Sequence, residues 1–541
     1  FYARFNKFCL GLGYEEKIVY DQGAVEKMRQ VVRDNPAMLL WTHKTYLDGM
    51  VVPKVLYDND FPMPHMFGGA NMNFPGLGFL LHRAGAIFIK RSFQDNELYK
   101  ITLRHYIGYL MEKRFPMNWA FEGTRSRMGK LMPPRYGLLK YVLEACHATD
   151  ATNIHIIPIS ISYDLIRDVE EYATEQTGRG KGAESLRWFI GYIRSLARPM
   201  GKVYMDIGEP VVLAEAPQPD DKLALSKIAF EVAVEANHVT PITFPSLVTM
   251  SLLGASPGAL TEDEVVRELD VLLAWAEARE LRISADFDRA YADQMEGLLG
   301  IMIDEGMVTR YDEGPDVVYA IEQEQHAVAS YYRNTIIHFF VNKAIIELAL
   351  LKTSETEGAG ALEVFWNEVD KLRDLFKFEF FYAPTDVFHE QIREELARYA
   401  PNWEELLQQG APGFLQLQTN MLLLVSHATL LTYAEAYSIV AELLAGMDSS
   451  EPLTEEQCVT RSLKLGHQAY LQRRISSPAS IGKLLFKNGF KMAEHRKLTM
   501  GGGEDVAEAR QALAREIRDV LRRLELIRAL GVSIRGTLME K

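Results

Sequence analysis

The sequence predicts an α/β domain with a mixed sheet flanked by helices, followed by a mostly α-helical C-terminal region. One observation is that short apolar runs alternate with amphipathic stretches through about residue 210, which is the pattern of an α/β unit. Another is that almost every later segment repeats its apolar residues at helical spacing. The 541 residues, 48% of them apolar and 24% charged, indicate a globular protein of roughly two to four domains.

The strands of the first domain are predicted from short apolar runs. Residues 96–114 carry apolar side chains near helical spacing and predict a helix between the second and third strands. Residues 214–221 combine proline with acidic residues and predict a linker, so the first domain is expected to cover residues 1–215. The five predicted strands are residues 37–42, 86–89, 117–121, 154–162 and 202–207.

Two further regions, 216–352 and 353–541, are predicted to be helical. Thr261 and Glu264 have the spacing of a capping box at the start of a helix. Residues 309–323 have the polar composition and central Gly-Pro of a hairpin.

Two apolar stretches are interpreted as buried helices and not as membrane spans. Residues 336–351 contain Lys343 and Glu347, and residues 421–434 fall short of the roughly 20 apolar residues that a span needs.

The charge and cysteine content exclude several classes of protein. The net charge is −14, with 27 Lys and Arg against 23 Asp and Glu in residues 1–215 and 32 against 50 in the remainder. An acidic total argues against a general nucleic-acid binder, so no nucleic-acid partner is expected. Three scattered cysteines exclude a disulfide scaffold and favour a reducing compartment. Because the first residue is Phe1, we expect that the sequence starts inside a longer chain.

Residues 461–497 form a basic segment that contains nine Lys or Arg and one acid, Glu494. Such a cluster attracts anionic lipid headgroups, and the same field would steer an acidic carrier protein. A solvated helix face is the alternative interpretation. We predict peripheral membrane attachment through this segment.

Two motifs that resemble catalytic signatures are discarded. Residues 254–258 fit G-x-S-x-G, but Pro257 has no N–H for the oxyanion hole of a serine hydrolase. Residues 389–393 begin like a zincin helix but carry Arg393 in place of the second zinc ligand. No motif requires a metal, and none is expected.

The strongest candidate for catalysis is His43 with Asp48, directly after an apolar run. On a continuous helix a spacing of five would hold the two side chains about 140° apart. They can meet only if a strand ends at His43 and a turn brings Asp48 back. An imidazole can then accept a proton from an alcohol while the carboxylate fixes its tautomer. A loop histidine and an ordinary capping aspartate are the alternative.

Other predicted strand ends in the same domain carry groups that suit a phosphate. Lys90 and Arg91 follow one strand, and residues 121–127 (FEGTRSR) follow another. Arginine binds phosphate oxygens bidentately, hydroxyls add donors, and glycine allows close approach of the backbone. Solvated basic loops are the alternative, but α/β sheets tend to gather ligands at strand ends.

Four sequence blocks, THKTYLDG, GAIFIKR, FEGTRSR and IIPISISYD, occur in the order and spacing of the motifs of the glycerolipid acyltransferases. The intervening sequence resembles the bacterial membrane-associated glycerol-3-phosphate 1-O-acyltransferases. Likeness to their C-terminal region extends to YYRNTIIHFF (residues 331–340) and the basic segment.

The resemblance implies transfer of a fatty acyl group from acyl carrier protein or acyl-coenzyme A to the 1-hydroxyl of glycerol 3-phosphate. The product would be lysophosphatidic acid, in the first step of phospholipid synthesis. His43 would be the general base and Asp48 would orient it, with no cofactor beyond the acyl donor as co-substrate. The acceptor-binding blocks correspond to Lys90, Arg91, Glu122, Gly123, Thr124, Arg125 and Ser126, and Pro158 matches the fourth block in a structural or acyl-site role.

The sequence departs from the usual pattern at Lys44, Thr45 and Lys90, where the family more often has Arg, Ser and Arg. Because lysine cannot reproduce a bidentate arginine contact, other acceptors stay open, namely dihydroxyacetone phosphate and lysophosphatidate. A catalytically silent lipid-associated scaffold is a further alternative. The resemblance implies a peripheral location on the cytoplasmic face of the inner (plasma) membrane.

Overall fold

The computed structural model describes residues 2–73, 77–90, 96–178, 186–356, 358, 360–421 and 423–539. The chain forms two compact units. Unit 1 comprises Phe1–Val169, Lys181–Pro245 and Ala276–Ile301, and unit 2 comprises Glu170–Gly180, Ser246–Trp275 and Met302–Lys541. The predicted segments 1–215, 216–352 and 353–541 do not coincide with these units, and as a division into domains they stay a prediction.

Unit 1 is built on a seven-stranded sheet with the order β3-β2-β4-β1-β5-β6, in which β7 also pairs with β5. Strands β1 to β5 run parallel, and β6 and β7 run antiparallel to β5. The predicted mixed sheet is therefore confirmed. The strands are β1 (Ala37–Trp41), β2 (His65–Gly69), β3 (Ala86–Ile89), β4 (Met117–Ala120), β5 (Thr152–Tyr163), β6 (Val203–Ile207) and β7 (Val211–Glu215).

All five predicted strands are present, and the sequence pattern missed β2 and β7. β2 carries two glycines among five residues, which weakens its strand signal. β7 lies at an edge and has no buried residue, so it lacks the apolar run that marked the others.

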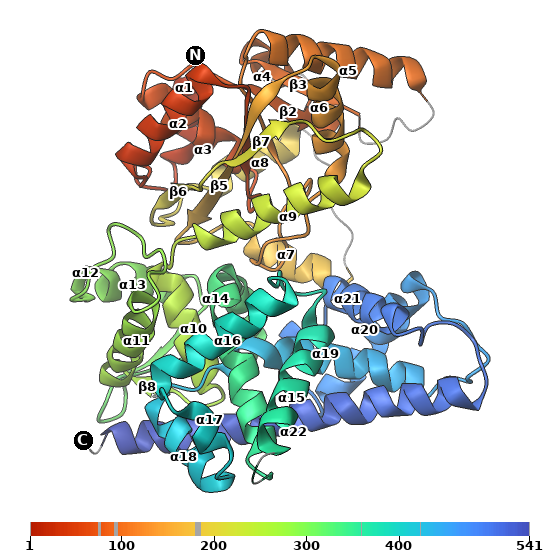
Figure 1. The fold of residues 1–541 in the computed structure, drawn as a ribbon. Helices are drawn as coiled ribbons and strands as arrows, with labels where there is room; N and C mark the ends of the chain where they lie inside the picture. The colour runs from red at the N-terminus through yellow and green to blue at the C-terminus, as the bar shows by residue number, and fades with distance from the viewer. Residues whose placement is uncertain are drawn as a thin grey trace. The chain divides into compact units, whose positions relative to one another are not determined.

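Helices flank this sheet (Figure 1). Asp21 begins α2 by accepting the backbone N–H groups of Gly23 and Ala24, and Asn96 begins α5 in the same way. α5 packs on α6, and α9 lies against both α6 and β5. The helices of unit 1 are α1 (Tyr2–Leu10), α2 (Gln22–Asp34), α3 (Asp48–Asp58), α4 (Leu77–Arg83), α5 (Glu97–Glu112), α6 (Tyr136–Ala148), α8 (Leu186–Ser195), α9 (Lys222–His238) and α12 (Ala292–Glu296).

Unit 2 is mostly helical, as predicted, and its center is formed by α14, α19 and α22, which pack on one another. α10 (Phe244–Ala255), α11 (Glu262–Glu277) and α13 (Leu298–Asp304) each continue from one unit into the other. The remaining helices are α7 (Val169–Gln176), α14 (His326–Thr353), α15 (Gly360–Phe376), α16 (Thr385–Tyr399), α17 (Trp403–Leu407), α18 (Ala411–Asn420), α19 (Ser426–Ala445), α20 (Glu455–Leu471), α21 (Lys483–His495) and α22 (Glu504–Met539).

Two local predictions in unit 2 are confirmed. The Thr261 N–H donates to a Glu264 carboxylate oxygen at 2.6 Å and the Glu264 N–H donates to the Thr261 hydroxyl at 3.3 Å, which is a capping box. The predicted hairpin consists of β9 (Thr309–Tyr311) and β10 (Val318–Ala320), which pair antiparallel, with β8 (Leu260–Thr261) on the other side of β10.

Among the described residues, one helical stretch, Gln323–Thr353, is long and apolar enough to cross a membrane. Its most apolar window is 72% buried inside the protein. Within it, Glu347 lies 3.3 Å from Lys343 and accepts the N–H groups of Val425 and Ser426 at the start of α19. These contacts make α14 a core helix of unit 2, as the sequence predicts.

Candidate active site

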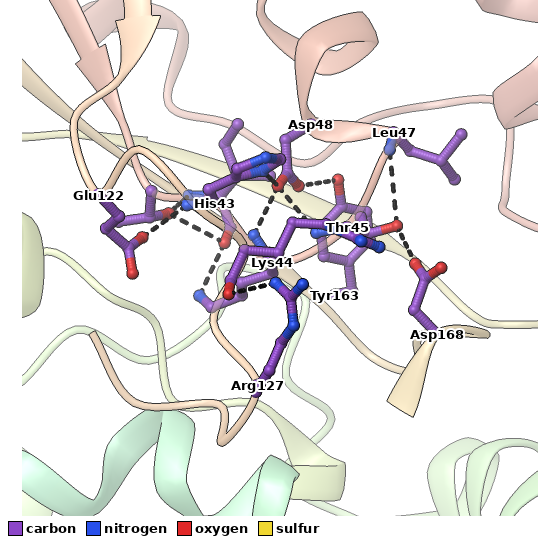
Figure 2. Close-up of polar contacts among 12 residues, drawn as sticks. His43, Lys44, Thr45, Leu47, Asp48, Glu122, Arg127, Tyr163 and Asp168 are labelled. Atoms are coloured by element: carbon purple, nitrogen blue, oxygen red, sulfur yellow. Dashed lines mark hydrogen bonds and ion pairs between the residues drawn. The ribbon is translucent and has the colours of Figure 1, made fainter. Parts of the chain in front are cut away.

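The predicted catalytic pair, His43 and Asp48, lies on the turn between β1 and α3. β1 ends at Trp41, the chain turns, and α3 begins at Asp48. The turn brings His43 Nδ1 to 2.9 Å from Asp48 Oδ2 (Figure 2). This is the geometry that the spacing requires, because a strand end and a turn allow a contact that a continuous helix forbids.

Asp48 is fully buried, and four donors surround its carboxylate. Oδ2 accepts the backbone N–H groups of Lys44 and Thr45 at 2.6 and 2.9 Å, in addition to His43. Oδ1 accepts the hydroxyl of Tyr163, at the end of β5, at 2.6 Å. Burial raises the pKa of Tyr163 well above its usual value, so this hydroxyl stays protonated and donates. The carboxylate is therefore held in one orientation.

These contacts fix the proton on the imidazole. Because Asp48 presents only lone pairs to it, His43 Nδ1 donates its hydrogen, and Nε2 carries the free lone pair. The His43 side chain keeps 22% of its surface exposed, whereas Asp48 has none. The edge of the Trp41 ring packs against the imidazole. The arrangement can therefore take a proton from a bound hydroxyl at Nε2.

The two residues after His43 point into the protein. Lys44 Nζ donates to the Ile161 carbonyl at 2.7 Å and lies 3.1 Å from the Ser162 hydroxyl, and burial lowers its pKa to about 8. The Thr45 hydroxyl contacts Asp168 and Tyr192. The departures from the family pattern at these two positions therefore fall on buried supporting contacts.

Glu122 joins this turn to the loop after β4. Its Oε1 accepts the His43 N–H at 2.6 Å and its Oε2 accepts the Met132 N–H at 2.8 Å. Complete burial raises the pKa of Glu122 to about 8. Both oxygens are engaged by backbone amides, so Glu122 positions the base and the loop relative to each other. Its predicted contact with the acceptor stays a prediction.

The rest of the predicted acceptor loop lies beside the same turn. The Ser126 N–H donates to the His43 carbonyl at 2.7 Å, while the Ser126 hydroxyl donates to the Lys130 carbonyl. Thr124 is exposed, and the Arg125 guanidinium lies 3.6 Å from the center of the Tyr46 ring.

Gly123 is required by the backbone of this loop. Its φ is +68°, and a Cβ there would come within 2.6 Å of Arg135 Cγ. Any other residue would strain the loop that carries the predicted phosphate-binding residues.

Lys90 follows β3, on the same edge of the sheet as His43, because β1 to β4 are parallel. Its backbone N–H donates to the Tyr99 hydroxyl oxygen at 3.2 Å, and its side chain is exposed. β3 is three strands from β1, or about 14 Å at roughly 4.8 Å a strand, so a bound molecule could extend between them. Arg91 lies outside the described residues.

Pro158 has a structural place in β5. Neighbouring N–H groups of β5 alternate between β1 and the antiparallel side, and that of Pro158 would face the gap between β6 and β7. The missing donor therefore costs no ladder hydrogen bond. The Pro158 carbonyl accepts the N–H of Gly208, in that gap, at 2.9 Å.

Sequence reasoning missed the residues that support the turn. Tyr163 was part of the fourth block but had no assigned role. Asp168, Tyr192 and Trp188 contact the turn from later segments, the Trp188 ring lying 4.5 Å from that of Tyr46. An apolar strand ending in Ser-Tyr-Asp was the one signal for Tyr163. In the described part of the chain, no group of three or more His, Cys, Asp or Glu side chains is placed to hold a metal.

The basic segment is less available than its composition suggests. Arg496 contacts Asp374 and Glu516, at 3.0 and 2.7 Å. Lys487 and Arg474 also form ion pairs, with Glu455 and Glu442. Five other cations of the segment have exposed side chains: Arg461, Lys464, Arg473, Lys491 and Lys497.

Comparisons with known proteins match both the sheet region and the helical region of the chain. Residues 23–162 match the acyltransferase family model, and residues 172–501 match the model of the glycerol-3-phosphate acyltransferase C-terminal region. A Mycobacterium tuberculosis (H37Rv) protein, plsB1, whose name assigns it as an acyltransferase, is 33% identical over 523 residues, covering 95% of this chain and 84% of that protein. The glycerol-3-phosphate acyltransferase of Pseudomonas aeruginosa is 25% identical over 86% of this chain and 57% of its own length.

Among solved structures, the 1-acyl-sn-glycerophosphate acyltransferase PlsC of Thermotoga maritima matches with 17% identity and a TM-score of 0.28, over 44% of this chain and 76% of that one. The two family models together span the sheet with the His43–Asp48 turn and most of the helical region. The chain is an acyltransferase that belongs to the glycerol-3-phosphate acyltransferase family.

Proposed function

We propose that this protein transfers a fatty acyl group from a thioester donor to the 1-hydroxyl of glycerol 3-phosphate, giving lysophosphatidic acid. The observation that carries the proposal is the 2.9 Å contact between His43 Nδ1 and a fully buried Asp48, which leaves Nε2 as a base. The family supports an acceptor of this class. Acyl carrier protein and acyl-coenzyme A both fit as donors.

The chemical step needs one base and no covalent intermediate on the protein. His43 Nε2 takes the proton of the acceptor hydroxyl while its oxygen attacks the thioester carbonyl carbon and forms the C–O bond. Asp48 stabilises the resulting imidazolium through Nδ1. The tetrahedral intermediate then collapses, the C–S bond breaks, and the imidazolium gives its proton to the leaving thiolate.

The phosphate of the acceptor is proposed to bind the cations at the strand ends. Lys90 lies on the edge where His43 lies, and the 121–127 loop is tied to the His43 turn through Glu122 and Ser126. Thr124 adds an exposed hydroxyl, and Gly123 lets the backbone approach closely. A base with cations and a hydroxyl on the same edge of the sheet suits an acceptor that carries both a hydroxyl and a phosphate.

We also propose that the protein works as a peripheral protein on the cytoplasmic face of the inner membrane. A lipid product supports this placement. So does the burial of Gln323–Thr353, the one helical stretch among the described residues that is long and apolar enough to span a membrane. The basic segment stays a prediction as the surface that meets lipid or the acidic carrier protein.

Release of free thiol from acyl-coenzyme A by the purified protein in detergent, with and without glycerol 3-phosphate, tests the proposal. We expect release that depends on the acceptor and falls about 100- to 10,000-fold in His43→Ala, which is the range for loss of a general base. Asp48→Asn should lower kcat in the same way. His155→Ala, at a half-buried histidine on β5, is the matched control and should keep the full rate.

Full activity of His43→Ala would show that the proposed base is wrong. A faster rate with dihydroxyacetone phosphate or lysophosphatidate would replace the proposed acceptor. If neither acyl-coenzyme A nor acyl carrier protein supports release with any of the three acceptors, the chain is a silent scaffold.

A further inference from the structure

The outer face of α5 is apolar, and its large side chains are exposed. Its inward face, formed by Leu103, Ile107, Leu110 and Met111, is buried. On the opposite side, residues at positions 98, 101, 105 and 109 follow helical spacing, and those at 98, 101 and 109 are Leu, Ile and Tyr. Leu98 is 75% exposed, Ile101 47% and Tyr109 51%. A helix that is apolar on both sides has a second partner.

Exposed apolar residues continue beyond α5. Phe79 on α4 is 62% exposed, and Phe115, just after α5, and Tyr106 are exposed as well. α4 leads into β3, and Tyr99 of α5 contacts the backbone of Lys90 at the end of β3. The start of α5 therefore lies near the end of β3, at the edge of the sheet that also holds the His43 turn.

Cations accompany these apolar side chains. The Arg83 guanidinium lies 4.2 Å from the center of the Phe79 ring, and Lys113 Nζ lies 5.9 Å from that of Tyr109. Arg114 is exposed at the end of the helix. α5 carries two acidic residues, Glu97 and Glu112. Glu97 forms an ion pair with Lys100 at 2.6 Å, so its charge is balanced within the helix. The face is therefore apolar with a positive border.

We propose that this face, called here the α5 face and made of Phe79, Leu98, Ile101, Tyr106, Tyr109 and Phe115 with Arg83, Lys113 and Arg114, docks on an anionic lipid bilayer. Stable attachment without a spanning helix needs two signals, inserted apolar side chains and attraction of cations to anionic headgroups. The α5 face offers both. The inference rests on the proposed peripheral attachment and names the surface that makes it.

The basic segment offers less apolar surface for the same task. Leu471 is its one large apolar side chain that is strongly exposed among those described, and three of its cations are paired with acids. Docking through the α5 face would hold the acceptor loops close to the bilayer, where a single-chain lipid product can leave without crossing water.

A labelling experiment tests this surface directly. The three native cysteines are buried, so a cysteine introduced by Leu98→Cys is labelled selectively with an environment-sensitive fluorophore. Vesicles of phosphatidylglycerol and phosphatidylethanolamine should shift its emission to the blue, and phosphatidylcholine vesicles should do so far less. Leu415→Cys, at an exposed leucine of unit 2, is the matched control and should show no shift.

Vesicle flotation then measures the contribution of the face to binding. The triple variant Leu98→Ser, Ile101→Ser, Tyr109→Ser should lower partitioning to anionic vesicles about tenfold or more, since each side chain loses its insertion. The control triple, Leu223→Ser, Val234→Ser, Leu415→Ser, removes as many exposed apolar side chains elsewhere and should bind like the wild type. Lys113→Glu with Arg114→Glu should weaken binding and reduce its salt dependence.

Wild-type partitioning of the triple variant, or an unshifted Leu98→Cys label, overturns the inference. The inference is also overturned if vesicle binding is lost only when the charges of the basic segment are reversed, at Arg461, Lys464, Arg473 and Lys491. That result would assign attachment to the basic segment. Thiol release in detergent, where no bilayer is needed, separates a failure of the docking surface from a failure of the proposed reaction. A variant that no longer floats but keeps its acceptor-dependent rate supports the surface, whereas an inactive wild type whose label still shifts refutes only the proposed reaction.

Discussion

Tyr163→Phe isolates the hydrogen bond that completes the catalytic carboxylate. The change removes one oxygen atom and keeps the buried ring, so it leaves the packing of β5 intact. In the wild type the Tyr163 hydroxyl donates a hydrogen bond to Asp48 Oδ1 at 2.6 Å, and the variant loses it. A hydrogen bond to a charged group contributes about 1.5–3 kcal/mol, and the oxygen left behind is fully buried.

The cost should appear both in folding and in catalysis. A loss of about 2 kcal/mol lowers the Tm of a unit of this size by roughly 4–8 °C. Asp48 can then turn toward another donor, and the imidazole loses its fixed orientation. If the same energy is missing in the transition state, kcat falls about 10- to 100-fold, with little change in the KM for the acceptor.

Tyr14→Phe is the matched control for this prediction. Its hydroxyl is also buried and donates to the Leu165 carbonyl at 2.8 Å, and its ring lies 5.4 Å from that of Tyr163. We expect a lower Tm with an unchanged kcat, because this hydroxyl donates to a backbone carbonyl and Tyr163 is the tyrosine that donates to Asp48. The assays are thermal unfolding and acceptor-dependent thiol release. A Tyr163→Phe protein with a reduced Tm and the full kcat would refute the reasoning.

Three more predictions follow from the geometry. Gly123→Ala should cost about 1–3 kcal/mol of stability because of its positive φ, and it should raise the KM for the acceptor. The control is Gly137→Ala, at a helical glycine with open space around it, which should be neutral or stabilising. Burial raises the pKa of Asp164 to about 7, so the folded state binds this proton more tightly and the free energy of unfolding falls as pH rises from about 4 to about 7. Urea titrations at about pH 5 and about pH 7.5 should show a smaller fall in the free energy of unfolding for Asp164→Asn than for the wild type. An equal fall in the two proteins would contradict the pKa shift. Glu347→Gln should lower the Tm of unit 2, because breaking the buried pair with Lys343 costs about 3–5 kcal/mol. Vesicle flotation should stay unchanged. Lost flotation at an unchanged Tm would contradict the place of Glu347 in the core.

The sequence predicted the parts of the fold and site that depend on neighbouring residues. His43 and Asp48 share one turn, so their spacing already limited the geometry that could join them. The capping box at Thr261 is likewise a pattern within four residues. The sequence pattern missed β7 because it has no buried residue, and β2 because its buried pair, Met66 and Phe67, is followed by two glycines. Both segments are strands because neighbouring strands pair with them.

The supporting contacts could not be predicted in the same way. Tyr163 lies 115 residues from Asp48 along the chain, and Tyr192 lies 147 residues from Thr45. Such contacts follow from the order of the strands and from where a late helix returns, which no local pattern contains. The contacts of Glu122 with the backbone N–H groups of His43 and Met132 are also absent from any local pattern, and its predicted contact with the acceptor stays a prediction.

The backbone contacts of the site indicate how acceptor preference can vary without loss of the base. Glu122 and Ser126 tie the acceptor loop to the His43 backbone, so the loop and the imidazole keep one relative position. Among the described residues that are predicted to bind the acceptor, Thr124 and Lys90 have exposed side chains. A change of acceptor is therefore expected to act through these exposed groups, whereas changes in Asp48 or in its buried donors should lower the rate with every acceptor alike.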